Sequence, residues 1–135
     1  MKFLVDANVL SEVTRPEPCP AVVKWLRKYE RDLTVTPIVL GEIEYGIGLT
    51  ASSRKRKELE LWFAKGLQRL RVVDLDAGTA SVWAALLVRL KKKGQAMPVK
   101  DSLIAASALQ HQLTIVTRNI SDFKNSEVPL INPFE

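Results

Sequence analysis

The chain has 135 residues, of which 47% are hydrophobic and 26% charged, and its formal net charge is +5. This composition is typical of a folded globular domain, and it excludes a disordered chain, a collagen-like chain and a coiled coil. No stretch approaches the ~20 apolar residues that cross a bilayer, and the apolar run near the N-terminus is too short for a secretory signal. We therefore expect a single domain over residues 1–135, without a membrane partner, that works in the cytoplasm.

The first quarter of the chain predicts two short strands separated by helical segments. Residues 2–5 form an apolar run with β-branched and aromatic side chains, which is typical of a buried strand. Helices are predicted over residues 8–13 and 21–31, because prolines end the first and apolar side chains recur at helical spacing in the second. Residues 33–36 predict the second strand.

Two further helices are predicted before residue 71. Pro37 suits the first turn of a helix that continues to about Leu49. Ser52 or Ser53 can cap the next helix, which would leave its basic residues facing outward. The predicted apolar face of that helix consists of Leu59, Trp62, Phe63, Leu67 and Leu70.

The second half of the chain continues the alternation of strands and helices. Strands are predicted at residues 71–75, 113–117 and 128–131, with Pro129 favouring an edge position for the last one. A long amphipathic helix over residues 77–93 ends at Gly94, and another covers residues 98–112. This alternation predicts an α/β fold with a central, mostly parallel sheet of four to five short strands and helices on both faces.

Four acidic side chains are expected at one edge of this sheet. Asp6 directly follows the first strand, and Glu42 lies about a turn and a half into the helix after the second strand. Asp101 lies in the first turn of the helix before the fourth strand, and Asp122 follows that strand after a short turn. Because sites in open parallel sheets lie at the carboxyl ends of the strands, these carboxylates are candidates for a common site.

A bound cation would explain why carboxylates gather, since they otherwise repel one another. The single Cys19 and the single His111 exclude an internal disulfide and a zinc site built from such residues. Oxygen ligands suit Mg²⁺ or Mn²⁺, and such an ion can activate water for in-line cleavage of a phosphodiester bond. Taken singly, Asp6 can also cap a helix, Asp101 complement a helix dipole and Asp122 form a turn.

The excess positive charge is concentrated in residues 53–71. This segment holds seven basic and two acidic side chains, whereas the other 116 residues carry 13 of each sign. A basic patch on an otherwise balanced domain favours a polyanionic partner. The alternative is a solvated helix face without a partner.

Three segments resemble the acidic motifs of the PIN domain family, and they occur in that family's order: LVDANVLSE, VTPIVLGEIEYGI and PVKDSLIAASALQHQLTIVTRNISDF. The resemblance runs from residue 3 to about residue 123 and is greatest to VapC-type toxins of bacterial toxin–antitoxin pairs. It implies a PIN-like three-layer sandwich and a Mg²⁺-dependent endoribonuclease that a small VapB-like antitoxin neutralises. It also implies a homodimer, with the antitoxin placing a C-terminal peptide over the acidic groove.

The resemblance also assigns roles to particular residues. Asp6, Glu42 and Asp101 match the acidic positions that bind the metal and serve catalysis. Many relatives carry a fourth acid where this chain has Asn119, and the nearby carboxylate here is Asp122, so the fourth catalytic position is open between them. The supporting polar residues would be Asn8, Thr117 and Asn119. Charge, and not the resemblance, indicates the residues that would contact RNA, because an acidic site repels phosphates unless basic side chains attract them. These are Arg54, Lys55, Arg56, Lys57 and Arg118.

Other classes of function explain fewer of these features. A non-catalytic nucleic-acid-binding module would use the basic 54–71 segment and would not need the acids. A haloacid-dehalogenase-like phosphotransferase would need a second Asp two residues after Asp6, where this chain has Asn8. A receiver-like domain would need more acids near the first strand and a lysine after a later strand.

Apolar residues beyond the needs of a small core are expected near the end of the Glu42 helix and in the helix after it. They are Tyr45, Ile47, Leu49, Trp62 and Phe63. Part of this surface is predicted to bind a partner, and the alternative is that all of it belongs to the core.

Overall fold

The computed structural model describes residues 2–135, and its centre is a parallel sheet in the order β3-β2-β1-β4-β5. Every strand pairing is parallel. The strands are β1 (Phe3–Val5), β2 (Leu33–Val35), β3 (Arg71–Val72), β4 (Thr114–Val116) and β5 (Leu130–Ile131). The predicted α/β fold is confirmed, and β5 lies at an edge, as its proline indicated.

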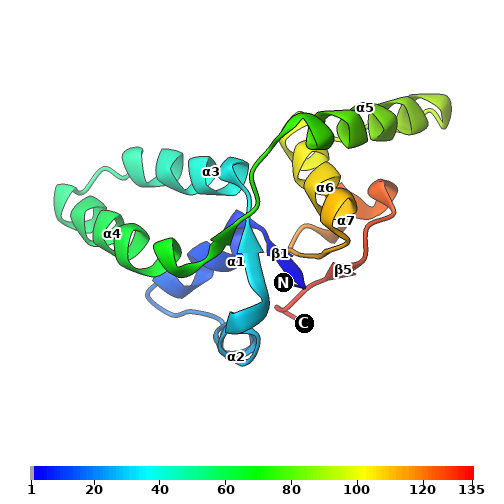
Figure 1. Ribbon diagram of the computed structural model, residues 1–135. Coiled ribbons are helices and arrows are strands. Elements are labelled where there is room, and N and C mark those ends of the chain that lie inside the picture. The colour runs from blue at the N-terminus through cyan, green and yellow to red at the C-terminus, as the bar shows by residue number, and fades with distance from the viewer. Residues whose placement is uncertain (1) are drawn as a thin grey trace.

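Helices cover the sheet on both sides. In Figure 1, α3 and α4 lie to one side of the strands, and α5, α6 and α7 lie to the other. The helices are α1 (Ala7–Leu10), α2 (Pro20–Lys28), α3 (Pro37–Gly48), α4 (Ser53–Gly66), α5 (Ala77–Lys92), α6 (Val99–His111) and α7 (Ile120–Phe123). Short 3₁₀ turns are η1 (Ser11–Thr14), η2 (Glu30–Asp32), η3 (Leu67–Arg69) and η4 (Lys124–Ser126). The arrangement is the predicted three-layer sandwich, and no helix within residues 2–135 has the length and hydropathy needed to cross a bilayer.

Local sequence signals determine where the long helices begin. The side chains of Thr36, Ser52 and Asp76 accept backbone N–H bonds at the starts of α3, α4 and α5. Pro37 occupies the first turn of α3, where its missing N–H costs nothing. The start of α3 is therefore fixed, and with it the position of Glu42 one and a half turns later.

Two short helical segments of the structure differ from the prediction. The predicted helix over residues 8–13 is the four-residue α1 followed by the 3₁₀ turn η1. Glu12 is buried in η1, where its Oε2 accepts a bond of 2.9 Å from the backbone N–H of Cys19, which ties the proline-rich loop to this turn. Helix α7 was not predicted, because a single turn carries too little periodicity to be seen in a sequence.

The core lies on both faces of the sheet, since Leu4, Val5, Ile115 and Val116 are all fully buried. The predicted apolar face of α4 is only half-buried, except for Leu67, which lies beyond the helix in η3 and is buried.

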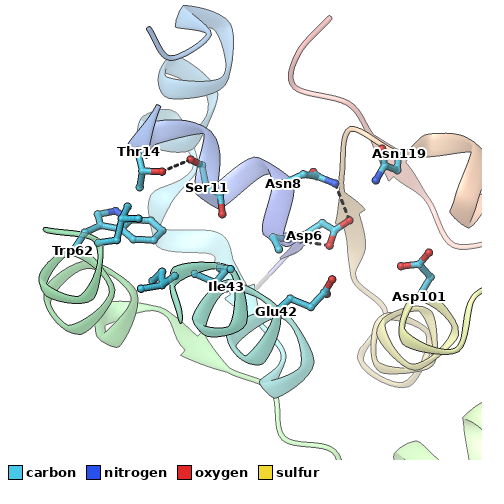
Figure 2. Close-up of a pocket in the computed structure, with 13 residues that line it drawn as sticks. Asp6, Asn8, Ser11, Thr14, Glu42, Ile43, Trp62, Asp101 and Asn119 are labelled. Atoms are coloured by element: carbon cyan, nitrogen blue, oxygen red, sulfur yellow. Dashed lines mark hydrogen bonds between the residues drawn. The ribbon is translucent and has the colours of Figure 1, made fainter. Parts of the chain in front are cut away.

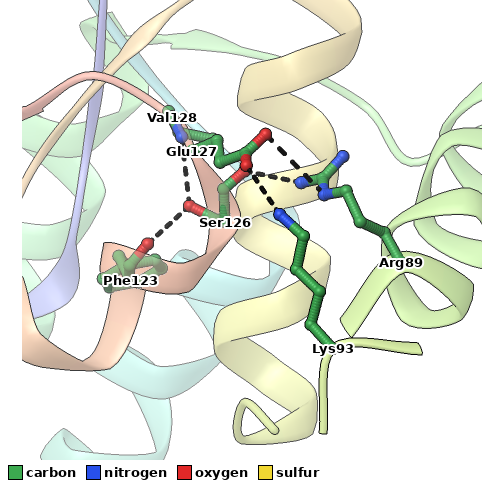
Figure 3. A network of polar contacts seen from close by, with 6 residues as sticks. All are labelled: Arg89, Lys93, Phe123, Ser126, Glu127 and Val128. Carbon is green, nitrogen blue, oxygen red and sulfur yellow. Dashed lines mark hydrogen bonds and ion pairs between the residues drawn. The ribbon is translucent and has the colours of Figure 1, made fainter. Parts of the chain in front are cut away.

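A polar network joins the C-terminal end of α5 to the segment after α7 (Figure 3). The Arg89 guanidinium donates a bond of 2.8 Å to the backbone oxygen of Ser126, and it lies 3.8 Å from the Glu127 carboxylate. The Lys93 ammonium lies 3.1 Å from the same carboxylate. These contacts fix α5 against the C-terminal third of the chain, on the side of the sheet that also carries α6.

Candidate functional site

Asp6 lies at the carboxyl end of the central strand and is 6% exposed. Its Oδ1 accepts a bond of 2.9 Å from the backbone N–H of Ala7, so the side chain caps α1. Its Oδ2 accepts bonds from the Thr117 hydroxyl at 2.8 Å and from the Asn8 amide at 3.2 Å. The pKa of the Asp6 carboxyl is raised above its ordinary value, because the effect of burial outweighs that of these three hydrogen bonds, which lower it. The cap predicted as an alternative role is therefore present, and it fixes the orientation of the carboxylate.

Thr117 connects the ends of β1 and β4. Its fully buried hydroxyl donates to Asp6 and accepts a bond of 3.0 Å from the backbone N–H of Asn119. The Asn8 side chain crosses the same gap, because its Oδ1 accepts a bond of 3.1 Å from the backbone N–H of Arg118. Two of the three residues predicted as supporting, Asn8 and Thr117, thus hold the Asp6 carboxylate in place.

Asp101 lies in the first turn of α6 and is partly exposed. Its pKa is raised from 3.8 to about 6. Burial is the largest cause, and the negative charges of Asp6, Asp122 and Glu42 add to it. The positive charge of Lys100 acts in the opposite direction. Repulsion from the other three predicted acids therefore adds to the effect of burial at Asp101.

Glu42 presents its two carboxylate oxygens to different surroundings. Oε2 lies 3.4 Å from the ammonium of Lys100. Oε1 is buried and has no hydrogen-bond partner among the described residues. An unpartnered buried carboxylate oxygen is costly, and a ligand that supplies positive charge or a donor would remove the cost.

The acids open into a cavity of about 470 Å³ (Figure 2). The carboxylates of Asp6, Glu42 and Asp101 point toward a common space at one end, and Trp62 lies at the other. The cavity is lined by Asp6, Ala7, Asn8, Ser11, Thr14, Glu42, Ile43, Gly46, Ile47, Leu59, Trp62, Asp101 and Asn119. It is therefore a groove with an acidic end and an apolar end.

The carboxylates at the acidic end of the cavity fit a Mg²⁺ or Mn²⁺ ion that keeps several waters better than an ion whose ligands all come from the protein. Within residues 2–135, no three acidic, histidine or cysteine side chains are arranged to hold one ion directly. Mg²⁺ usually keeps several waters and takes one or two carboxylates. The unpartnered Oε1 of Glu42 and the repulsion felt by Asp101 are what such an ion would relieve.

Asp122 and Asn119 occupy different positions relative to the cavity. Asn119 lines it, whereas Asp122 is exposed in the first turn of α7 and acts on Asp6 and Asp101 through its charge. Of the two candidates for the fourth position, Asn119 thus lies on the cavity wall and Asp122 does not.

The predicted RNA-binding residues do not line the cavity. Within α4, Arg54 and Arg56 lie 3.7 Å from Glu58 and Glu60, which offsets part of their charge. The Lys55 ammonium lies 3.4 Å from the backbone oxygen of Thr14 on the cavity wall.

Arg118 extends from the end of β4, where its guanidinium stacks over the Phe134 ring at 4.6 Å. Its backbone N–H is bound to Asn8, so the residue starts beside the acids although its side chain turns to the C-terminal segment. Arg118 therefore flanks the site rather than lining it.

Some lining residues were not identified as site residues from the sequence. Thr14, Ile43, Leu59 and Trp62 lie on one wall of the cavity because η1, α3 and α4 pack together there. Leu59 and Trp62 were assigned to a helix face, which is correct, but that face covers a groove as well as the core. The contact of Lys100 with Glu42 was also missed, and the one signal for it was its place beside Asp101.

An open parallel sheet with clustered acids at its carboxyl edge defines the class: an α/β domain with an acidic site at the ends of its strands. Residues 3–126 match the PIN domain family, and the chain belongs to that family.

Relatives and solved structures extend the match over nearly the whole chain. The chain is 31% identical over 136 residues to Toxin FitB of Neisseria gonorrhoeae (strain ATCC 700825 / FA 1090), covering 98% of each chain. It is 32% identical over 126 residues to Ribonuclease VapC2 of Rickettsia felis (strain ATCC VR-1525 / URRWXCal2), covering 92% of this chain and 91% of the relative. The solved structure of FitAB bound to an IR36 DNA fragment superposes with a TM-score of 0.91 at 30% identity, covering 98% of this chain and 96% of that chain.

Proposed function

We propose that this PIN domain is a metal-dependent endoribonuclease toxin that cleaves phosphodiester bonds of RNA and is neutralised by a small antitoxin. The observation that carries the proposal is the convergence of Asp6, Glu42 and Asp101 on one cavity, with Oε1 of Glu42 buried and unpartnered. The relatives named as a toxin and a ribonuclease support the same activity.

Asp6 and Asp101 would hold the ion, with Glu42 joining directly or through a water molecule. When bound, Mg²⁺ or Mn²⁺ supplies an activated water and stabilises the charge that develops on the phosphate. The chain itself contributes orientation: Ala7, Asn8 and Thr117 fix the Asp6 carboxylate with three hydrogen bonds. Such pre-set geometry avoids reorganisation of the site during the reaction.

Asp101 is mostly a carboxylate at neutral pH, because its pKa is about 6 in the metal-free protein, and it is therefore available to hold a cation. Asn119, with both a donor and an acceptor on the cavity wall, can orient a phosphate oxygen or a water without adding negative charge.

Positive charge outside the cavity would bring RNA to an acidic site that otherwise repels it. Lys55 and Lys57 are exposed on the first turns of α4. Lys55 reaches the backbone of Thr14 on the cavity wall, so this end of α4 lies beside the groove. The basic residues of α4, and Arg118 on the other flank, would contact phosphates on the two sides of the bond to be cut.

The antitoxin would bind along the groove. The acidic end of the groove suits a basic side chain of a bound peptide, and the apolar end suits an apolar one. The solved FitAB structure supports a partner of this kind. We also propose a homodimer that uses the end of α3, where Tyr45 is 70% exposed and Leu49, the residue after the helix, is 67% exposed. Ile47, predicted with them, is buried in the core, so the surplus apolar surface is smaller than predicted.

A cleavage assay on the purified chain tests the proposed reaction. RNA is incubated with wild-type protein in Mg²⁺ and in EDTA, beside Asp6→Asn and, as a matched control, Asp74→Asn, an exposed carboxylate on the far side of β2. We expect cleavage in Mg²⁺ alone, its loss in Asp6→Asn and wild-type activity in Asp74→Asn. Equal activity of Asp6→Asn and wild type would refute the reaction. Tight RNA binding without cleavage would instead favour the nucleic-acid-binding module.

A further inference from the structure

Glu42 forms a wall between two hollows of the surface. On one side it lines the acidic cavity with Asp6 and Asp101. On the other side it lines a second hollow of about 310 Å³, which Lys100 and Tyr45 also line. Lys100 does not line the acidic cavity, so its ammonium approaches Glu42 from behind.

Because of this contact, the two carboxylate oxygens of Glu42 have different surroundings. The Lys100 ammonium lies 3.4 Å from Oε2, and Oε1 is left buried and without a hydrogen-bond partner. The Lys100 side chain is 66% exposed and that of Glu42 is 27% exposed. The ion pair therefore stands at the rim of the site, where water reaches the lysine but hardly reaches Oε1.

Lys100 also acts on the neighbouring acid. It directly precedes Asp101 in the first turn of α6, so its positive charge adjoins that acid as well as Glu42. A lysine in this position reduces the negative charge of the cluster before any cation arrives. The Lys100 ammonium would repel a divalent ion that bound to the same acids.

We propose that Lys100 is an internal counter-cation of the acidic site: it neutralises Glu42 in the metal-free protein and weakens the binding of the divalent ion. The inference rests on the proposed function, because it concerns the metal that the acids would hold. It goes beyond that function in naming a residue that sets the metal affinity without contacting the substrate, which makes Lys100 a positioning residue rather than a catalytic one.

The test is the dissociation constant of Mg²⁺, measured by calorimetry and by thermal shift in the absence of RNA. The variants are Lys100→Gln, Lys100→Arg and, as a control of equal charge change, Lys24→Gln, an exposed lysine on α2. We expect Lys100→Gln to bind Mg²⁺ about three- to tenfold more tightly, the size of one partly screened charge contact. Lys100→Arg and Lys24→Gln should stay within about twofold of wild type, since both leave a positive charge beside Glu42.

The possible results separate this inference from the proposed function. If wild type binds Mg²⁺ and Lys100→Gln binds it equally or more weakly, the inference is overturned and the nuclease proposal stands. If neither Mg²⁺ nor Mn²⁺ binds wild type at millimolar concentration, the metal-dependent function fails and the inference fails with it. Circular dichroism spectra of all three variants should match wild type, because both lysines are exposed.

Discussion

Removing one charge from the acidic cluster should stabilise the metal-free protein. In Asp101→Asn the side chain keeps its shape but no longer carries the charge that Asp6, Asp122 and Glu42 repel. The pKa of Asp101 rises from 3.8 to about 6 on folding, which at full strength corresponds to roughly 3 kcal/mol. Because the side chain is partly exposed, solvent screens much of this, and we expect about 1 kcal/mol at pH 8.

The direction of the pH dependence follows from the raised pKa. The folded protein holds the Asp101 proton more tightly than the unfolded chain, so wild type loses stability as the pH rises from about 4 through about 6. Asp101→Asn lacks this loss. Its advantage should therefore be complete above pH 7, should shrink as the pH falls toward 4, and should disappear near pH 3, where the carboxyl is protonated in both states.

Thermal unfolding in EDTA measures this difference. About 1 kcal/mol corresponds to roughly 3–5 °C in melting temperature for a domain of this size. Millimolar Mg²⁺ should reverse the order, because it stabilises wild type by binding and the variant has lost a ligand. The reasoning would be refuted if Asp101→Asn melted at or below the wild-type temperature at pH 8 in EDTA.

Three further expectations concern the supporting residues, the basic segment and assembly. Thr117→Val and Thr34→Val each remove a buried hydroxyl that donates a hydrogen bond, so both should cost about 1–2 kcal/mol in urea denaturation, but only Thr117→Val should slow RNA cleavage. In an Asp6→Asn background, Lys55→Gln and Lys57→Gln should each weaken RNA binding and reduce its salt slope by about one, whereas Lys24→Gln should not. Tyr45→Asp should yield a monomer in light scattering at tens of micromolar, and an unchanged mass would place the interface elsewhere.

Much of the fold is predictable because its three central strands, β2, β1 and β4, are largely buried on both faces. Residues 2–5 contain the apolar run Phe3–Val5, which forms β1, and residues 113–117 are rich in β-branched side chains and contain β4. The short elements are less predictable: the predicted strand at 71–75 is paired at residues 71–72, where it lies on an edge. Nothing in the local sequence distinguishes an edge strand of two residues from one of five.

The candidate site, like the fold, could be predicted only in part from the sequence. Asp6, Glu42 and Asp101 could be placed at one edge because each follows from a strand end or a helix start. Their distances from one another, and the choice between Asp122 and Asn119, depend on side-chain directions that the order of the elements leaves open. The ion pair of Lys100 with Glu42 joins residues 58 positions apart, and neither residue signals the other.

The hydrogen bond between Thr117 and Asp6 spans 111 positions of a 135-residue chain. During translation, the first acid leaves the ribosome long before Asp101 and Thr117 are made, and β1 has no β4 to pair with until then. A nascent or prematurely terminated chain accordingly has no assembled site. For a protein proposed to cut RNA, this order of synthesis delays activity until almost the whole chain exists, so that the messenger and the ribosome producing it are not exposed to a half-made nuclease.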